Sequence, residues 1–171
     1  GNLLFSDSNC NTPAPASSVT IAQNNNPAKF YIYTTTSGDI SISTDTGGSG
    51  STNINFNVIP DVASQVVFVD SFGPSTLDTD TCTGPYKIEL RDRFGNLTPT
   101  GSSLAITASF NPSGSLFENS DCSTPLGPIA AGTTFKEFYL KIGGNGGGSV
   151  SVLAGGFSDS RTFTVLPPAN I

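Results

Sequence analysis

The chain of 171 residues contains no histidine, no methionine and no tryptophan. Without histidine it lacks the most common general base and the most common neutral metal ligand, and it cannot hold a Ser-His-Asp or Cys-His catalytic arrangement. Lysine does not supply the alternative, because none of the lysines lies in a Ser-x-x-Lys pattern. We therefore predict that the protein is not an enzyme and has no catalytic residues and no cofactor.

Charged residues are scarce at 12% of the chain, and acidic residues outnumber basic ones by 13 to 7. This balance argues against nucleic acid or an anionic membrane surface as a partner. No segment approaches the roughly 20 apolar residues of a membrane-spanning helix, so we predict no membrane span. The DxDxDG series of a calcium loop is also missing. We predict no metal site, although carboxylates such as Asp61 and Asp92 leave calcium at domain junctions open.

Glycine and proline are plentiful, at 19 and 12 residues, and strong helix formers are few. Apolar residues alternate with polar ones over short segments, as half-buried strands require, and turn residues separate these segments. The expected strands in the second part of the chain lie at residues 66–69, 86–90, 104–108, 135–142, 150–153 and 162–166. The pattern predicts an all-β protein built as an antiparallel two-sheet sandwich.

The chain also repeats itself. Residues 4–13 read LFSDSNCNTP and residues 116–125 read LFENSDCSTP, and further matches join 30–32 to 138–140 and 56–60 to 163–167. A period on the order of 110 residues indicates whole domains in tandem and not a solenoid. We assign residues 1–59 to the C-terminal half of one repeat, 60–168 to a complete repeat, and 169–171 to a tail or the start of a linker.

Three cysteines fit this division. Cys82 and Cys122 belong to the complete repeat, while Cys10 takes the place of Cys122 in the half repeat. We predict a Cys82–Cys122 disulfide and leave Cys10 unpaired within this chain. Disulfides persist in oxidising compartments, which predicts an extracellular or cell-surface location.

The segment YKIELRDRFGN at residues 86–96, followed by LAITA at 104–108, resembles bacterial immunoglobulin-like repeats of the invasin and intimin type. The sharpest match is the turn Asp92-Arg93-Phe94-Gly95-Asn96. The resemblance implies an immunoglobulin-like fold and the role of a stalk segment in a surface adhesin. The missing tryptophan excludes the Cys…Trp…Cys core of antibody domains.

We therefore expect a structural stalk or filament segment. The alternative is a recognition module that binds a glycan or protein through loops such as 71–81 or 143–148, the latter a glycine-rich hairpin loop. Asn96 begins an Asn-Leu-Thr sequence and is a candidate glycosylation site. A half sandwich exposes strand edges and an apolar face. We accordingly expect residues 1–59 to be completed by another copy or by the missing upstream half of the same protein, and a host or cell-surface ligand is a further candidate partner.

Overall fold

The computed structural model describes residues 3–5, 8–11, 29–45 and 50–167, and every regular element in these ranges is a β-strand. The all-β prediction is thus confirmed. None of the described residues forms a helix that is long and apolar enough to cross a bilayer. The chain divides into two compact units, Gly1–Pro60 and Asp61–Ile171. The strands of unit 1 are β1 (Leu3–Phe5), β2 (Tyr31–Tyr33), β3 (Gly38–Asp45) and β4 (Ser51–Val58).

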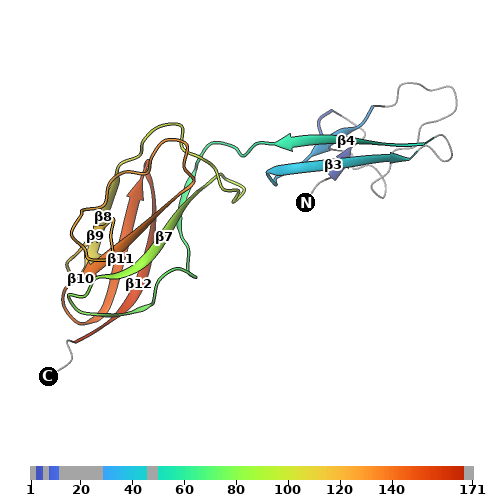
Figure 1. Cartoon of the computed structure of the whole chain (residues 1–171). Helices are drawn as coiled ribbons and strands as arrows, with labels where there is room; N and C mark the ends of the chain where they lie inside the picture. The colour runs from blue at the N-terminus through green and yellow to red at the C-terminus, as the bar shows by residue number, and fades with distance from the viewer. Residues whose placement is uncertain (1–2, 6–7, 12–28, 46–49, 168–171) are drawn as a thin grey trace. The chain divides into compact units, whose positions relative to one another are not determined.

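Unit 2 contains eight strands in two four-stranded sheets (Figure 1). The first sheet has the order β5-β7-β10-β9, made of β5 (Gln65–Phe68), β7 (Thr83–Arg91), β10 (Phe135–Ile142) and β9 (Gly114–Phe117). The second sheet has the order β6-β12-β11-β8, made of β6 (Thr76–Asp78), β12 (Phe157–Leu166), β11 (Gly146–Ala154) and β8 (Ile106–Asn111).

This order is that of an immunoglobulin-like sandwich, in which the first, second, fifth and fourth strands share one sheet and the remaining strands share the other. The first strand is split, so that β5 pairs with β7 in one sheet and β6 pairs with β12 in the other. All pairs are antiparallel except β6 with β12, which is parallel. The predicted immunoglobulin-like antiparallel sandwich is confirmed.

The core lies between the two sheets and follows from the alternation along each strand. On β7, Tyr86, Ile88 and Leu90 are fully buried. The Tyr86 ring stacks on Phe138 of β10 and meets Phe163 of β12 edge to face, which joins the two layers. The other fully or nearly fully buried apolar side chains are Val66, Phe68, Leu77, Leu116, Ile129, Leu140, Ile142, Val150, Val152, Ala154 and Val165.

Two features of unit 2 differ from the expected strands. The short strands β6 and β9 were not expected, because three or four residues carry too little alternation to be detected. Residues 143–148 were expected to be a hairpin loop, yet Gly146–Gly148 belong to β11 and pair with β12. At Gly148 a Cβ atom would lie 3.2 Å from Val165 Cγ2, so glycine suits the close packing there.

Unit 1 contains two separate two-stranded sheets, β1 with β2 and β3 with β4. The pair β3 and β4 forms a long antiparallel hairpin (Figure 1) in which Ile40 lies opposite Phe56 and Ile42 opposite Ile54. Phe56 and Ile54 are 40% and 42% exposed. Among the described residues of unit 1, this apolar sheet face is therefore partly exposed to solvent.

A disulfide joins Cys82 to Cys122, with their Cα atoms 5.7 Å apart. Cys82 immediately precedes β7 and Cys122 lies in the loop after β9, two strands that flank β10 in the sheet. The bridge therefore spans β10 at the edge where β7 begins. Cys10 of unit 1 carries a free thiol.

We expect the double variant Cys82→Ser, Cys122→Ser to lower the free energy of unfolding of unit 2 by about 4 kcal/mol, because the unfolded chain regains the freedom of a loop with a sequence separation of 40 residues. Urea denaturation followed by circular dichroism measures the change. Cys10→Ser is the matched control and should leave the transition of unit 2 in place. Equal midpoints for the double variant and the unchanged chain would contradict the expectation.

Candidate functional site at the two ends of unit 2

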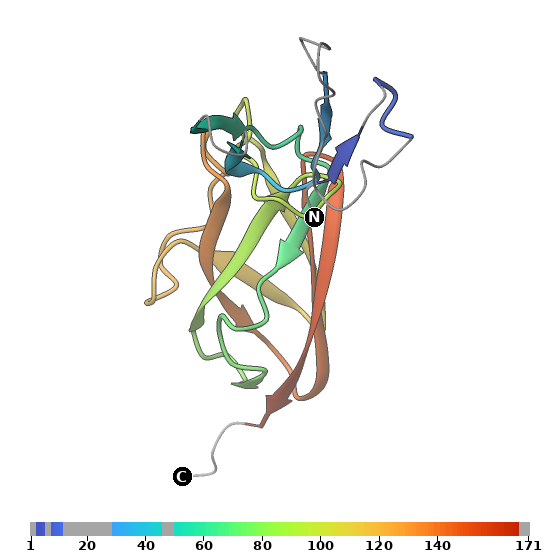
Figure 2. The same cartoon turned by 90° about the vertical axis from the view of Figure 1, so that its right-hand side faces the viewer.

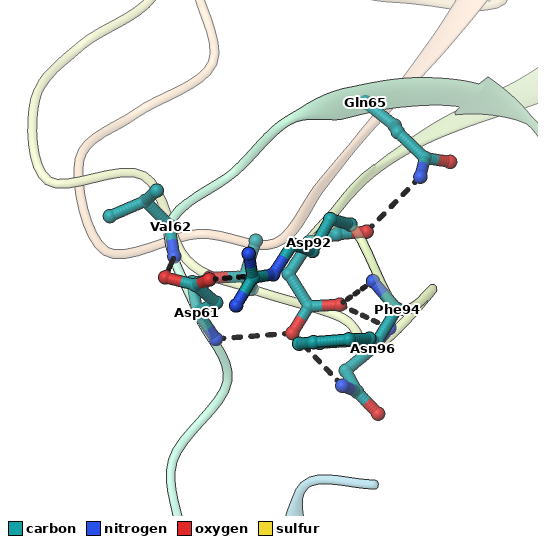
Figure 3. A network of polar contacts seen from close by, with 8 residues as sticks. Asp61, Val62, Gln65, Asp92, Phe94 and Asn96 are labelled. Atoms are coloured by element: carbon teal, nitrogen blue, oxygen red, sulfur yellow. Dashed lines mark hydrogen bonds and ion pairs between the residues drawn. The ribbon is translucent and has the colours of Figure 1, made fainter. Parts of the chain in front are cut away.

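The turn after β7 is organised around the carboxylate of Asp92, a residue that is 0% exposed. Its Oδ1 accepts hydrogen bonds from the backbone N–H groups of Phe94 and Asn96, each at 2.9 Å (Figure 3). The Asp92 N–H in turn donates to the Asn96 carbonyl at 2.9 Å. Gly95 sits between them with a φ of 88°, a conformation that glycine adopts without strain. The motif is thus a self-contained aspartate turn.

The second carboxylate oxygen of Asp92 holds the first residue of the unit. Oδ2 accepts the backbone N–H of Asp61 at 3.1 Å and the Nδ2 of Asn96 at 2.9 Å (Figure 3). The Asp61 carbonyl accepts the hydroxyl of Thr98 at 2.8 Å, and Gln65 Nε2 donates to the Asp92 carbonyl at 3.2 Å. The turn therefore fixes the point at which the chain enters unit 2.

The environment keeps Asp92 ionised. Burial acts to raise its pKa, but the hydrogen bonds from the Asn96 side chain and from the N–H groups of Asn96, Asp61 and Phe94 outweigh burial and hold the pKa at about 2. The Asp61 carboxylate itself lies 3.3 Å from Arg93 Nε in an exposed ion pair. Such exposed pairs contribute little to stability.

At the other end of unit 2, the chain leaves along β12 beside the parallel strand β6. The Thr164 N–H donates to the Ser75 carbonyl at 2.9 Å, and the Thr79 N–H donates to the Leu166 carbonyl at 3.0 Å. The Asp80 N–H donates to Ile142 of β10 at 2.9 Å, which ties the same corner to the other sheet. Cys82 follows directly, so the disulfide lies at this exit end.

The loop between β5 and β6 is clamped by two side chains from distant strands. Arg161 of β12 donates to the carbonyls of Phe72 and Gly73, the latter at 3.0 Å, and Tyr86 Oη donates to the Pro74 carbonyl at 2.8 Å. Burial raises the pKa of Tyr86 to about 12, although the nearby Arg161 lowers it in part. A Cβ atom at Gly73 would lie 2.3 Å from the Tyr86 ring, so only glycine fits here.

The sequence-predicted site residues fall into these two ends. Cys82 and Cys122 lie together at the exit end. Asn96, the candidate glycosylation residue, lies in the entry turn with its Nδ2 donating to Asp92, and glycosylation stays a prediction. Asp61 and Asp92 do meet, but through a backbone N–H and not as a pair of metal-ligating carboxylates.

No group of three or more acidic, cysteine or histidine side chains that could hold a metal occurs within the described parts of the chain. Loop 71–81, one of the candidate binding loops, has the backbone carbonyls of Phe72, Gly73 and Pro74 occupied by Arg161 and Tyr86. Sequence reasoning missed Arg161 because its partners lie 88 and 89 residues away. The available signal was Arg161 as the one cationic residue of β12, a strand whose other charged residue is Asp159.

Comparison with known proteins finds similarity in structure alone. No protein-family model and no curated protein matches the sequence. Among solved structures, surface layer protein SbsC, domains 1–6, is 14% identical over 79% of this chain with a TM-score of 0.44. A beta-glycosidase from Bacteroides vulgatus is 12% identical over 96% of the chain with a TM-score of 0.47. The adhesin InvE of Yersinia pseudotuberculosis is 12% identical over 86% with a TM-score of 0.39. The chain spans 17%, 21% and 45% of these three chains.

We expect the stability of unit 2 to carry an acid-dependent contribution from Asp92. Because the folded pKa of about 2 lies below the ordinary aspartate pKa of 3.8, this contribution is fully present above about pH 4 and is lost as the pH falls towards 2. The Asp92→Asn variant lacks the contribution. Its free energy of unfolding should therefore be lower than that of the unchanged chain at pH 7 and should fall less steeply between pH 4 and pH 2.

Urea titrations at a series of pH values test this. Asp78→Asn, a change at an exposed aspartate, is the matched control and should keep the full slope. Glu89 and Glu118, whose pKa values are also lowered, contribute equally to all three proteins and cancel in the comparison. Parallel curves for Asp92→Asn and the unchanged chain would rule out the assigned role.

Proposed function

We propose that this chain is a non-enzymatic structural segment, a stalk or filament, of an extracellular immunoglobulin-like repeat protein. The observation that carries the proposal is the path of the chain through unit 2. The chain enters at the Asp92 turn, next to the last residue of β7. It leaves beside Thr79, close to the first residue of β7. These points are separated by the length of β7, roughly 27 Å. A domain with entry and exit at opposite ends can be joined into an extended array.

The exit end is built to resist tension along the chain. β12 runs along the unit (Figure 2), and β6 lies parallel to it with Thr76 opposite Thr164, Leu77 opposite Val165 and Asp78 opposite Leu166. When parallel terminal strands are pulled from opposite ends, they slide past each other, and the hydrogen bonds between them are loaded together. Hydrogen bonds that bear the load together must all break in the same step, and this arrangement supports a mechanical role.

Composition and covalent chemistry support the extracellular location. A disulfide within unit 2 suits an oxidising compartment. The low charge, the absence of histidine and the resemblance of residues 86–108 to bacterial immunoglobulin-like repeats agree with a stalk and not with an enzyme. In the repeat protein, the Asp92 turn would serve to start each domain directly after the preceding one.

Single-molecule pulling of the chain from its two ends tests the mechanical role. Thr164→Pro removes the N–H that donates to Ser75 of the loop before β6, and we expect it to lower the unfolding force of unit 2. Ser160→Pro is the matched control, because Ser160 lies on the same strand outside the residues that pair with β6, and its N–H donates to the neighbouring Asp159 side chain at 2.8 Å. We expect Ser160→Pro to leave the unfolding force close to that of the unchanged chain.

Equal forces for Thr164→Pro and Ser160→Pro would count against the mechanical role. A separate binding assay addresses the alternative. If the chain binds a glycan or a cell surface saturably, with an affinity that survives Thr164→Pro, a recognition module describes it better than a stalk.

A further inference from the structure

The β3–β4 hairpin of unit 1 has one polar face and one apolar face. On the polar face, side chains form hydrogen bonds across the two strands: Asn57 Nδ2 donates to Asp39 Oδ1 and Ser43 Oγ donates to Asn53 Oδ1, both at 2.7 Å. The other face carries Ile40, Ile42, Ile54, Phe56 and Val58. A strictly amphipathic hairpin of this kind requires a second layer over its apolar face.

The corresponding hairpin of unit 2 has such a layer. Residues 56–60 match residues 163–167 in sequence, so Phe56 corresponds to Phe163. Phe163 is 4% exposed inside the sandwich, whereas Phe56 is 40% exposed. The pairing registers agree as well, since Gly38 lies opposite Val58 as Gly146 lies opposite Val165, and both glycines have positive φ.

This register refines the sequence match. The sequence aligns Gly38 with Gly148, but the pairing aligns it with Gly146. A shift of two residues keeps every side chain on the same face of the sheet. The apolar face of β3 and β4 therefore still corresponds to the buried face of β11 and β12.

The first sheet of unit 1 shows the same relation. Phe5 of β1 lies opposite Tyr31 of β2, as Phe117 of β9 lies opposite Tyr139 of β10. The turns that follow the two strands also match, because Cys10 and Cys122 both have positive φ, at 54° and 53°. Unit 1 thus holds counterparts of β9, β10, β11 and β12.

The described residues of unit 1 hold no counterparts of β6, β7 and β8, the strands that pair with β10, β11 and β12 in unit 2. In unit 2, β7 pairs with β10, β8 with β11, and β6 with β12. Within the described residues of unit 1, β2 pairs with β1 alone, and β3 and β4 pair with each other alone. Among these described residues, three strand edges and one apolar face therefore have no counterpart of the partners that residues 61–111 supply in unit 2.

We propose that unit 1 is completed by a segment of the same polypeptide built like residues 61–111 and joined directly ahead of β1. This segment supplies one strand antiparallel to β2, one antiparallel to β3 and one parallel to β4. It also supplies a cysteine just before the strand that pairs with β2, placed as Cys82 is placed relative to β7, and this cysteine pairs with Cys10. The inference rests on the correspondence of the two units and not on the proposed stalk function.

Two observations favour a covalently joined segment over a second copy. The matching segment of a second copy is already committed to its own unit 2, where Tyr86, Ile88 and Leu90 are fully buried. In unit 2 only Pro112 and Ser113 separate β8 from β9. Because β1 corresponds to β9, a link of the same length in unit 1 places the completing strand just ahead of β1 in the same chain.

The bond to Cys10 forms by thiol–disulfide exchange with a disulfide oxidant, whose own S–S bond breaks. Oxidised glutathione accepts the two electrons and two protons of the two thiols, one S–S bond forms between the cysteines, and two molecules of reduced glutathione leave. In unit 2 the same reaction gives the Cys82–Cys122 bridge.

The test places a duplicate of residues 61–112 directly ahead of residue 1 of the full chain and refolds the product in a glutathione redox buffer. Hydrogen exchange of β3 and β4 should slow by roughly 100-fold or more relative to the unextended chain. Cys10 should become inaccessible to alkylation, and mass mapping should find it bonded to the cysteine of the duplicate. The hydrogen exchange rates of unit 2 serve as the internal reference.

Two variants of the duplicate separate docking from cross-linking. Ile88→Asp in the duplicate alone places a charge at a core position and should restore fast exchange in β3 and β4 and free Cys10. Cys82→Ser in the duplicate alone should keep slow exchange while Cys10 stays reactive. Unchanged exchange and a reactive Cys10 in the extended chain would overturn the proposal. So would slow exchange of β3 and β4 in the unextended chain with a dimeric mass, which would assign the surface to a second copy.

Discussion

The structure depends on burying the apolar faces of two sheets against each other. A strand that alternates between apolar and polar residues is stable only when its apolar face meets a second layer. In unit 2 the Tyr86 ring satisfies this requirement by bridging Phe138 of one sheet and Phe163 of the other. In unit 1, Phe56, which matches Phe163 in the sequence, is 40% exposed.

Polar groups fix the chain at the two ends of unit 2. The Asp92 carboxylate, kept ionised by hydrogen bonds, holds the N–H of Asp61 at the entry. Backbone hydrogen bonds between the β6 region and β12 hold the exit. At both ends the donors and acceptors of these hydrogen bonds come from unit 2 itself.

Sequence patterns predicted those parts of the fold that depend on neighbouring residues. The alternation in 86–90 and 135–142 located β7 and β10. The turn at 92–96 was recognised because its residues, including the donors Phe94 and Asn96, lie within four residues of Asp92. The strands β6 and β9 escaped prediction because they are short and are held by pairing with distant strands. The glycines at 146–148 suggested a loop, since sequence does not reveal that Val165 packs against Gly148.

The sequence alone determined the strand content, the position of the entry turn and the absence of histidine chemistry, because each depends on composition or on local spacing. Tertiary structure decided what those residues do. It directs Arg161 to carbonyls 88 and 89 residues away, sets β6 parallel to β12, and brings Asp61 to Asp92 across 31 residues. These contacts exist only after the sheets have packed, because burial of the apolar faces is what brings distant polar groups within hydrogen-bonding distance.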